Sequence, residues 1–411
     1  MSTGIFNSGQ LTQDLAKKSF ASMITRLMPN GTAPLFGLTS MLPSDTAVQV
    51  EHGFFTKTML FPQLTVSAAG QLSTDTTFTV TATSNVLPGM IMRVDTTGEN
   101  ILINAVISGT QVSVQRAVGT VSAQAIAASV NLFQVGNAFE ESSVRPQSLI
   151  INPVRITNLT QIFRNTWAIS DTIRATMMIA GETNVAESRQ DCAAFHAADI
   201  EKMIFFGQKS QGSRNGQPFR TADGLINIVG NLSYYPSYFS AVNVNTAGGT
   251  TNYTQLEGFL DPVFNQATDP KVANERVLFV GGTAKRVINN IGRLNGTYYI
   301  VDGQTSYGLQ FSTFKTARGT FRMIEHPLFN SNTSWSKMAV AVDLSTFRLA
   351  YLGDRKTQNR EFNSPDGGSD LDVADNGIDA VGGTLTTEVT CVIKNPPANS
   401  IVYNLTQAAA G

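Results

Sequence analysis

The sequence predicts an α+β fold with one long helix, several extended strands and a small inserted all-β domain. Three observations lead to this prediction. Residues 184–206 carry the clearest helical pattern, several segments alternate apolar and polar residues, and residues 64–138 contain very few charges. A chain of 411 residues is long enough for more than one domain of about 150 residues.

The composition favours a protein whose surface is covered by other copies of itself. Charged residues make up 14% of the chain, whereas ordinary soluble domains contain about 25%. A free monomer with so few charges tends to associate. The net charge of -1 and the pI near 6.3 exclude a basic nucleic-acid surface at the level of the whole chain.

The sequence gives no signal for secretion or membrane anchoring. The N-terminal residues lack the apolar stretch of a signal peptide, and no run approaches the roughly 18 apolar residues that span a bilayer. The two cysteines, Cys192 and Cys391, lie far apart and do not form a disulfide framework. We therefore expect a soluble protein made in a reducing cytoplasm.

The sequence of the N-terminal third indicates an arm, a strand and an inserted domain. Residues 1–44 form the arm, and residues 45–63 form a strand rich in β-branched and aromatic side chains. Within residues 64–138, Phe78, Val80 and Ala82 alternate with threonines, and a hairpin is predicted around Ser108-Gly109. We expect four to six strands here, closed into a barrel or packed on neighbours.

The sequence of the central part indicates a strand that follows the inserted domain, and then the long helix. Residues 139–170 are extended, and they are expected to pair with residues 45–63 in a long hairpin that carries the insertion. A short helix is predicted from Ser170-Asp171 to near Gly181. The helix at 184–206 begins with the capping residue Asn184 and ends at Gly207. Its packing stripe is predicted to contain Ala186, Ala193, Ala197, Ile200 and Ile204.

The C-terminal part predicts a β/α domain and a closing strand. Residues 208–253 are polar and glycine-rich, with order expected only around 219–231. A helix capped by Thr254 follows, and a second helix is predicted with Val287, Ile288 and Ile291 facing inward. The tail at 384–405 is predicted to be one more long strand.

The sequence predicts no catalytic or cofactor-binding residue. There are only three histidines, and His52 and His326 each follow a glutamate without an H-E-x-x-H or C-x-x-C pattern. The segment GGTAKR follows a strand but lacks the spacing of a phosphate-binding loop. A G-x-S-x-G motif is absent from the sequence.

An aspartate-rich segment is the one weak candidate for a metal site. It contains Asp366, Asp370, Asp372, Asp375 and Asp379. Carboxylates at this density can bind Ca²⁺, but the spacing differs from an EF-hand loop and no glutamate closes it. A solvated loop is the favoured interpretation. The weak cation candidates are Asp370, Asp372 and Asp375.

Residues 151–176 have the character of a joint in a scaffold. The segment contains Arg155, Arg164 and Arg174 but no His, Cys or Glu. Arginine is favoured in contacts between subunits. We therefore expect strand formation and intersubunit contacts from this segment rather than chemistry.

Several segments together resemble the major capsid proteins of tailed bacteriophages. They are AFEESSVRP, NLTQIFRNTWAISDT, HAADIEKMIFFG, GLINIVG, LPGMIMRV, VLFVGGTAKRVIN and the final strand. The resemblance covers about residues 33–405, and it depends on the order and spacing of motifs that are individually weak. Thr160 stands where the family more often has Tyr, which affects the subgroup rather than the fold.

The resemblance implies the Hong Kong 97-type capsid fold. It implies an N-terminal arm at 1–44 and an extended loop, the E-loop, at 45–63 and 139–165 with the β insertion at 64–138. It implies a peripheral domain at 166–253 and 351–411 with a spine helix at 184–206, and an axial domain at 254–350. The assembly and packing candidates are Glu51, Phe54, Phe55, Arg155, Gln161, Phe163, Arg164, Ala193, Ala197, Ile200 and Ile204.

The implied function is structural. Copies are expected to form pentamers and hexamers and then an icosahedral shell around double-stranded DNA, assembled in the bacterial cytoplasm and retained in the virion. Expected partners are a portal and separate scaffolding or decoration proteins; no enzyme activity, cofactor or membrane is expected. The alternatives are an encapsulin-like compartment, an enzyme with a dispersed active site, and an extracellular β adhesin suggested by the Thr-rich insertion alone.

Overall fold

The computed structural model describes residues 33–57, 62–67, 69–150, 153–175, 184–235, 241–266, 274–295, 301–306, 309–362 and 380–408. The chain divides into two compact units. Unit 1 comprises Met1–Phe54, Ile156–Tyr235 and Ala241–Gly411, and unit 2 comprises Phe55–Arg155 and Pro236–Ser240.

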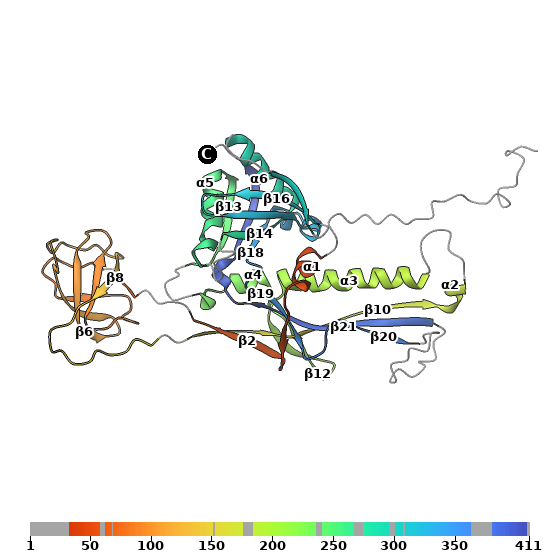
Figure 1. Ribbon diagram of the computed structural model, residues 1–411, viewed down its shortest axis with the longest axis horizontal. Helices are drawn as coiled ribbons and strands as arrows, with labels where there is room; N and C mark the ends of the chain where they lie inside the picture. The colour runs from red at the N-terminus through yellow and green to blue at the C-terminus, as the bar shows by residue number, and fades with distance from the viewer. Residues whose placement is uncertain are drawn as a thin grey trace, which may run out of the picture. The chain divides into compact units, whose positions relative to one another are not determined.

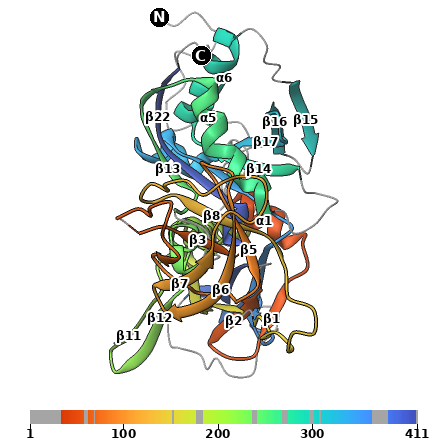
Figure 2. The same cartoon turned by 90° about the vertical axis from the view of Figure 1, so that its left-hand side faces the viewer.

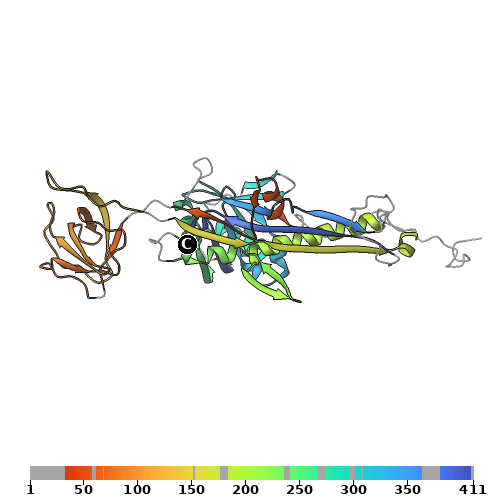
Figure 3. The same cartoon turned by 90° about the horizontal axis from the view of Figure 1, so that it is seen from below.

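The first sheet of unit 1 is built around a C-terminal strand. Its strands are β1 (Asp45–Ala47), β10 (Gln161–Ser170), β19 (Phe347–Leu352), β20 (Gln358–Phe362) and β21 (Ala380–Ile393). Strand β10 runs antiparallel along one side of β21, whereas β19 and β20 pair along the other. Helix α3 (Asn184–Phe206) lies along this sheet (Figures 1 and 3).

The sequence of β10 shows how the sheet packs on α3. Phe163 and Trp167 are 8% and 3% exposed, whereas Ile162 and Arg164, on either side of Phe163, are exposed. The Phe163 ring meets His196 of α3 edge to face, and Trp167 shares a buried cluster with Cys192. This period of two is typical of a strand with one buried face.

Helix α3 confirms the predicted bounds, but its buried side differs from the predicted stripe. Ile200 and Ile204 are fully buried as expected. Ala193, however, is exposed and Ala197 is half-buried. The predicted stripe followed heptad spacing, which drifts by about 20° per heptad around a straight helix. The buried side is instead centred on residues such as Cys192, His196 and Met203.

The second sheet of unit 1 has seven strands. In spatial order they are β13 (Val244–Thr251), β22 (Ser400–Ala408), β18 (Ala339–Val342), β14 (Glu275–Val280), β17 (Thr320–Glu325), β16 (Leu309–Lys315) and β15 (Val301–Ser306). Helices α5 (Tyr253–Leu260) and α6 (Gly282–Asn295) pack on it (Figure 2). Val287, Ile288 and Ile291 of α6 are buried, which confirms the inward face predicted for this helix.

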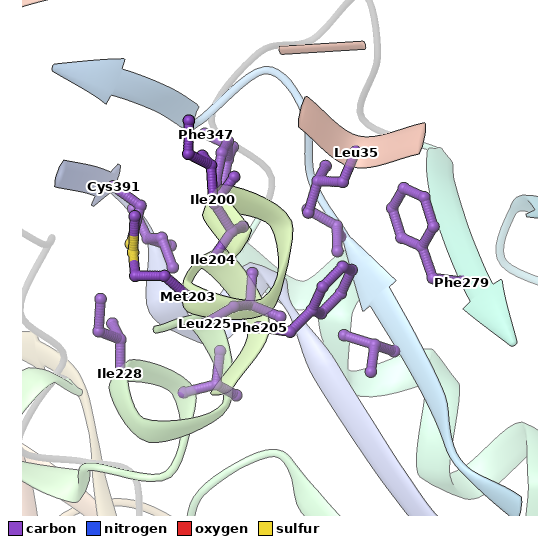
Figure 4. Close-up of a cluster of buried hydrophobic side chains, with 14 of the residues drawn as sticks. Leu35, Ile200, Met203, Ile204, Phe205, Leu225, Ile228, Phe279, Phe347 and Cys391 are labelled. Carbon is purple, nitrogen blue, oxygen red and sulfur yellow. The ribbon is translucent and has the colours of Figure 1, made fainter. Parts of the chain in front are cut away.

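Both faces are buried at the centre of this sheet, and β18 shows this most simply. All four of its residues are buried. Ala339 and Ala341 join the cluster that contains α5 and α6, whereas Val340 and Val342 join the cluster around the end of α3. Figure 4 shows that second cluster, in which residues from distant parts of the chain meet around Phe205. A continuous apolar strand is typical of a sheet covered on two sides.

The remaining elements of unit 1 are short. The helices are α1 (Pro34–Ser40), α2 (Asp171–Ala175) and α4 (Leu225–Val229), with 3₁₀ turns η2 (Leu232–Tyr234), η3 (Asp261–Gln266), η4 (Pro327–Ser331), η5 (Trp335–Lys337) and η6 (Pro396–Ala398). The strand pairs are β2 (Glu51–Thr56) with β9 (Val154–Leu159), and β11 (Ser210–Arg214) with β12 (Gln217–Thr221). The predicted continuation of the short helix toward Gly181 lies outside the described residues.

The predicted single C-terminal strand is wrong. The tail forms two strands that belong to different sheets, β21 in the first and β22 in the second. Pro396 and Pro397 form the turn between them. Proline has no backbone N–H to donate to a ladder, so the pair interrupts the strand. The range 351–411 therefore contributes to both sheets, as does 166–253 through β13.

Unit 2 contains a closed β-barrel. Its strands are β3 (Gln63–Thr65), β8 (Asn131–Asn137), β5 (Met90–Val94), β6 (Asn100–Ser108), β7 (Gln111–Gln115) and β4 (Thr77–Thr79). A bridge between Val66 and Val80 joins the first strand to the last. The hairpin around Ser108-Gly109 and the six strands confirm the prediction for this segment. Closure removes the free strand edges of this charge-poor sequence.

Two details of the predicted strands near unit 2 are wrong. Ala82 is exposed because the strand ends at the Val80 bridge. Residues 139–150 belong to no helix or strand, so the long hairpin reduces to the short pair β2–β9.

Two further elements differ from the prediction. Most of the hairpin β11–β12 lies before residue 219, where no order was expected, and only the end of β12 falls within the expected range 219–231. Asn215-Gly216 at its turn has positive φ values of 51° and 73°, which favour such a turn. Helix α5 is capped by Asn252 in a capping box with Gln255, rather than by Thr254.

No helix among the described residues is long and apolar enough to cross a membrane.

Candidate functional site

The segment from Thr157 to Asn165 links several distant parts of unit 1 through its polar side chains. It covers the end of β9 and the first half of β10. Its partners lie on α3, on the segment 209–223 and on β21. We call this segment the joint.

Asn158 is the most buried link of the joint. Its Nδ2 donates to the carbonyl oxygens of Asp223 and Cys391, both at 2.9 Å, and its Oδ1 accepts the Asp223 N–H at 2.7 Å. The side chain is 4% exposed. One amide therefore fixes β9 to both the Asp223 turn and the C-terminal end of β21. The loss of such buried bonds costs more than the bonds contribute.

Burial raises the pKa values of two ionisable groups around Asn158. Burial raises the pKa of the Cys391 thiol to about 12, and its Sγ donates to the Asp223 carbonyl at 2.8 Å. Burial also raises the pKa of the Asp223 carboxyl, against the opposing effect of bonds from Asn227 and the Lys209 N–H. A thiol in this state packs as a small apolar group rather than acting as a nucleophile.

Thr160 connects the joint to a buried carboxylate. Its hydroxyl donates to Glu388 Oε1 at 2.9 Å. Glu388 is 1% exposed and lies between two guanidinium groups, Arg355 at 2.7 Å and Arg220 at 3.5 Å. This pairing compensates a charge that burial would otherwise make costly.

Asn165 connects the joint to the long helix. Its Oδ1 lies 2.7 Å from His196 Nδ1, and its Nδ2 donates to Asp199 at 3.1 Å. The other ring nitrogen of His196 lies 2.7 Å from the Thr387 hydroxyl of β21. Burial lowers the pKa of His196 against the opposing charge of Asp199, which favours the neutral imidazole as a fixed bridge between helix and sheet.

A second buried imidazole fixes the segment that precedes β1. His326 Nε2 and Glu201 Oε1 lie 2.7 Å apart, and both side chains are fully buried. The Glu201 carboxylate also accepts the N–H groups of Leu35 and Phe36 at 2.8 and 2.6 Å. Leu35, which sequence analysis placed in the arm, is therefore part of the core of unit 1.

The structure brings together some of the predicted candidates and separates others. Gln161 accepts the Ala222 N–H and Glu51 bonds to Lys209, so both lie at the joint. Phe163, Ile200 and Ile204 are core residues, and Phe54 packs beside the small cluster of Ala47, Ala350 and Val392. Five candidates have side chains exposed in the single chain: Glu51, Phe55, Arg155, Arg164 and Ala193.

Sequence analysis missed the partners of the joint. Lys209, Asp223 and Glu388 carry no local motif, and Glu388 is 228 residues from its partner Thr160. The weak metal candidates Asp370, Asp372 and Asp375 lie outside the described residues. Among the residues that the structure describes, no group of three or more His, Cys, Asp or Glu side chains is arranged to hold a metal ion.

Known proteins resemble this chain over nearly its whole length. A family model described as "SU10 major capsid protein" matches residues 2–406. The major capsid protein of Pseudomonas phage PaMx41 is 37% identical over 409 residues, which cover 98% of this chain and 96% of that protein.

A solved structure supports the fold. The chain described as Mycobacterium phage Bobi superposes with a TM-score of 0.50 at 10% identity, covering 98% of this chain and 99% of that chain. At this identity the likeness concerns the fold alone. The α+β architecture described above is the Hong Kong 97-type capsid fold. From the family match, the curated relative and the shared fold, the chain belongs to the SU10 major capsid protein family.

Proposed function

We propose that copies of this capsid protein assemble through pentamers and hexamers into an icosahedral shell around double-stranded phage DNA. Membership in a major capsid protein family supports a structural role in the virion. The domain roles in this proposal are those expected from the sequence: arm (1–44), E-loop (45–63 and 139–165) with insertion (64–138), peripheral domain (166–253 and 351–411) and axial domain (254–350).

One observation supports self-assembly most directly. Residues 139–150 belong to no helix or strand, and they expose Val144 (88%), Ile150 (71%) and Leu149 (39%). Exposed apolar side chains gathered in one segment mark surfaces that bind other proteins. In the proposed shell a neighbouring copy covers this segment, and many such contacts add up although each is weak.

The proposal includes partners and a place of assembly. A portal and separate scaffolding or decoration proteins act with the shell, DNA is enclosed without sequence preference, and assembly takes place in the bacterial cytoplasm. The polar groups of the joint are bonded to partners on α3, on β21 and at Asp223, which supports a role in holding strands rather than in catalysis.

Electron microscopy and sedimentation of the full chain expressed alone test the proposal. Shells, capsomers or tubes are the expected result. A monomer that stays dispersed even with the neighbouring gene products added would overturn it, and a co-purified enzyme cargo would point to an encapsulin-like compartment instead.

Matched variants test the role of residues 139–150. Val144→Asp and Ile150→Asp place a charge on side chains that are exposed in the single chain, so folding is expected to be unchanged while particle yield falls at least about tenfold. Leu72→Asp is the control, because Leu72 is 66% exposed but lies within the barrel domain. Equal yields from all three variants would contradict the proposed contact.

A further inference from the structure

Lys209 joins the end of α3 to both strands of the β2–β9 pair. Its Nζ donates to Thr157 Oγ1 at 2.9 Å and to the Thr157 carbonyl at 3.3 Å, both on β9. The same Nζ donates to Glu51 Oε1 on β2 at 3.3 Å. One ammonium group therefore bonds to three oxygen atoms on two strands.

The backbone that carries Lys209 is fixed in place. Gly224 N–H donates to the Gly207 carbonyl at 2.9 Å, and the Lys209 N–H donates to Asp223 Oδ1 at 3.3 Å. A Cβ on Gly207 would lie 2.5 Å from the Ala222 carbonyl, and one on Gly224 would lie 2.5 Å from the Gly207 nitrogen. Glycine is required at both positions because the two backbones touch, so the base of the Lys209 side chain has little freedom.

The strand pair is shaped to receive the ammonium group. Gly53 of β2 lies directly against Thr157, where a Cβ would come within 2.7 Å of Thr157 Cγ2. The absence of a side chain at Gly53 leaves room for Thr157. Glu51 and Lys209 are 44% and 29% exposed, so their ion pair alone contributes little, and the bonds to Thr157 carry most of the link.

We propose that Lys209 is a positioning residue for assembly: it locks the β2–β9 pair to the end of α3, and this lock is required for particles of uniform size. The proposal rests on the proposed shell function. Strands β2 and β9 lead to and from residues 55–155, so a loose pair would let copies meet at variable angles. A shell of one size requires each contact to repeat with the same geometry.

Three variants of the full-length chain test the lock. Lys209→Met removes the charge and keeps the stem, and Lys209→Arg restores a donor of similar reach. Lys202→Met is the matched control, because Lys202 lies near the same helix end and bonds to Asp199 on its own helix. Hydrogen exchange of backbone amides at 51–56 and 154–159 is expected to be about tenfold faster in Lys209→Met, and near normal in the other two variants.

Thr157→Val tests the same link from its partner. Combining it with Lys209→Met is expected to raise exchange no further than Lys209→Met alone, since Lys209→Met already removes the bond to Thr157 Oγ1 that Thr157→Val removes. Unchanged exchange at 51–56 and 154–159 in Lys209→Met would overturn the lock.

Particle size gives the second measurement. In electron micrographs Lys209→Met is expected to give mixed diameters or open sheets, with one diameter recovered in Lys209→Arg. Uniform particles from Lys209→Met would overturn the proposed role in assembly. If the unmodified chain forms no particles, the proposed shell function is rejected. Hydrogen exchange then still tests, independently, whether Lys209 holds the β2–β9 pair to the end of α3.

Discussion

Replacing Arg116 by Met should destabilise the barrel of unit 2 more than most single substitutions would. Arg116 Nε and Nη2 donate to the two oxygens of Glu99 at 2.8 and 2.7 Å. Their side chains are 7% and 0% exposed. Arg116 also donates to the carbonyls of Leu72 and Gln124, at 2.8 and 2.6 Å, and lies over the Phe78 ring. The substitution thus removes four bonds and leaves a buried carboxylate without a cation.

The size of the effect follows from the burial of Glu99. Breaking a buried ion pair by removing one partner costs about 3–5 kcal/mol. A domain of about 100 residues has a free energy of unfolding of about 5–15 kcal/mol. The loss is therefore a large fraction of the stability of unit 2. At about 4–8 °C per kcal/mol for a domain of this size, its melting temperature should fall by roughly 12–40 °C.

Hydrogen exchange of backbone amides in strands β5 and β6 of the full-length chain measures the loss of barrel stability caused by Arg116→Met. Arg93→Met is the matched control, because Arg93 is exposed on β5 and its loss should change stability by less than about 0.5 kcal/mol. The double variant Arg116→Met with Glu99→Leu should recover much of the loss, since no buried charge remains. If Arg116→Met and Arg93→Met behave alike, the inference that this ion pair organises the barrel is wrong.

Three further predictions concern the core, the pH dependence and the insertion. Phe205→Ala should cost about 3–5 kcal/mol in chemical denaturation, because its fully buried ring contacts four other rings, whereas Leu232→Ala at a 45% exposed position should cost little. Burial alone would raise the pKa of Glu99, but bonds from Arg116 and two backbone N–H groups outweigh it and lower the pKa below 4.5. The stability that this carboxylate contributes is therefore complete above about pH 4.5 and is lost as pH falls through the folded-state pKa. Melting temperatures measured from pH 6 to 3 should fall accordingly, and Arg116→Met should make this fall with pH smaller. Replacing residues 62–138 by a short linker should leave the melting temperature of unit 1 unchanged. The reason is that the ends of the insertion are adjacent, since the Gln134 N–H bonds to the Pro62 carbonyl at 3.2 Å. A large fall in the melting temperature of unit 1 in calorimetry would contradict this.

Elements with strong local signals could be predicted from the sequence. The long helix has a cap, a long periodic run and a glycine at its end, so its bounds 184–206 agree with the structure. The hairpin at Ser108-Gly109 and the inward face of α6 depend on equally local patterns. In these cases neighbouring residues alone determine the conformation.

Other features depend on distant partners and could not be predicted. Nothing near Asn158 indicates that its amide bonds to Cys391, 233 residues later. Ala193 and Ala197 fit a heptad pattern, yet which side of α3 is buried is set by the sheet that it packs on. The sequence indicated a joint within residues 151–176, but the partners that Thr157–Asn165 bond to could be identified only from the folded structure.

The position of β21 and β22 has a consequence for the order of synthesis and folding. Strand β21 pairs with three strands of the first sheet, and β22 lies between β13 and β18 in the second. Neither sheet can be completed on the ribosome until residues 380–408 have been made, whereas the barrel of unit 2 pairs only strands within residues 63–137 and can form early. A chain broken off before residue 380 would therefore keep a folded barrel, but its first sheet would lack the strand that joins β10, β19 and β20, and its second sheet would lack the strand that joins β13 to β18. In the proposed assembly, completion of the chain would thus act as a quality check, because only a finished chain has both sheets complete.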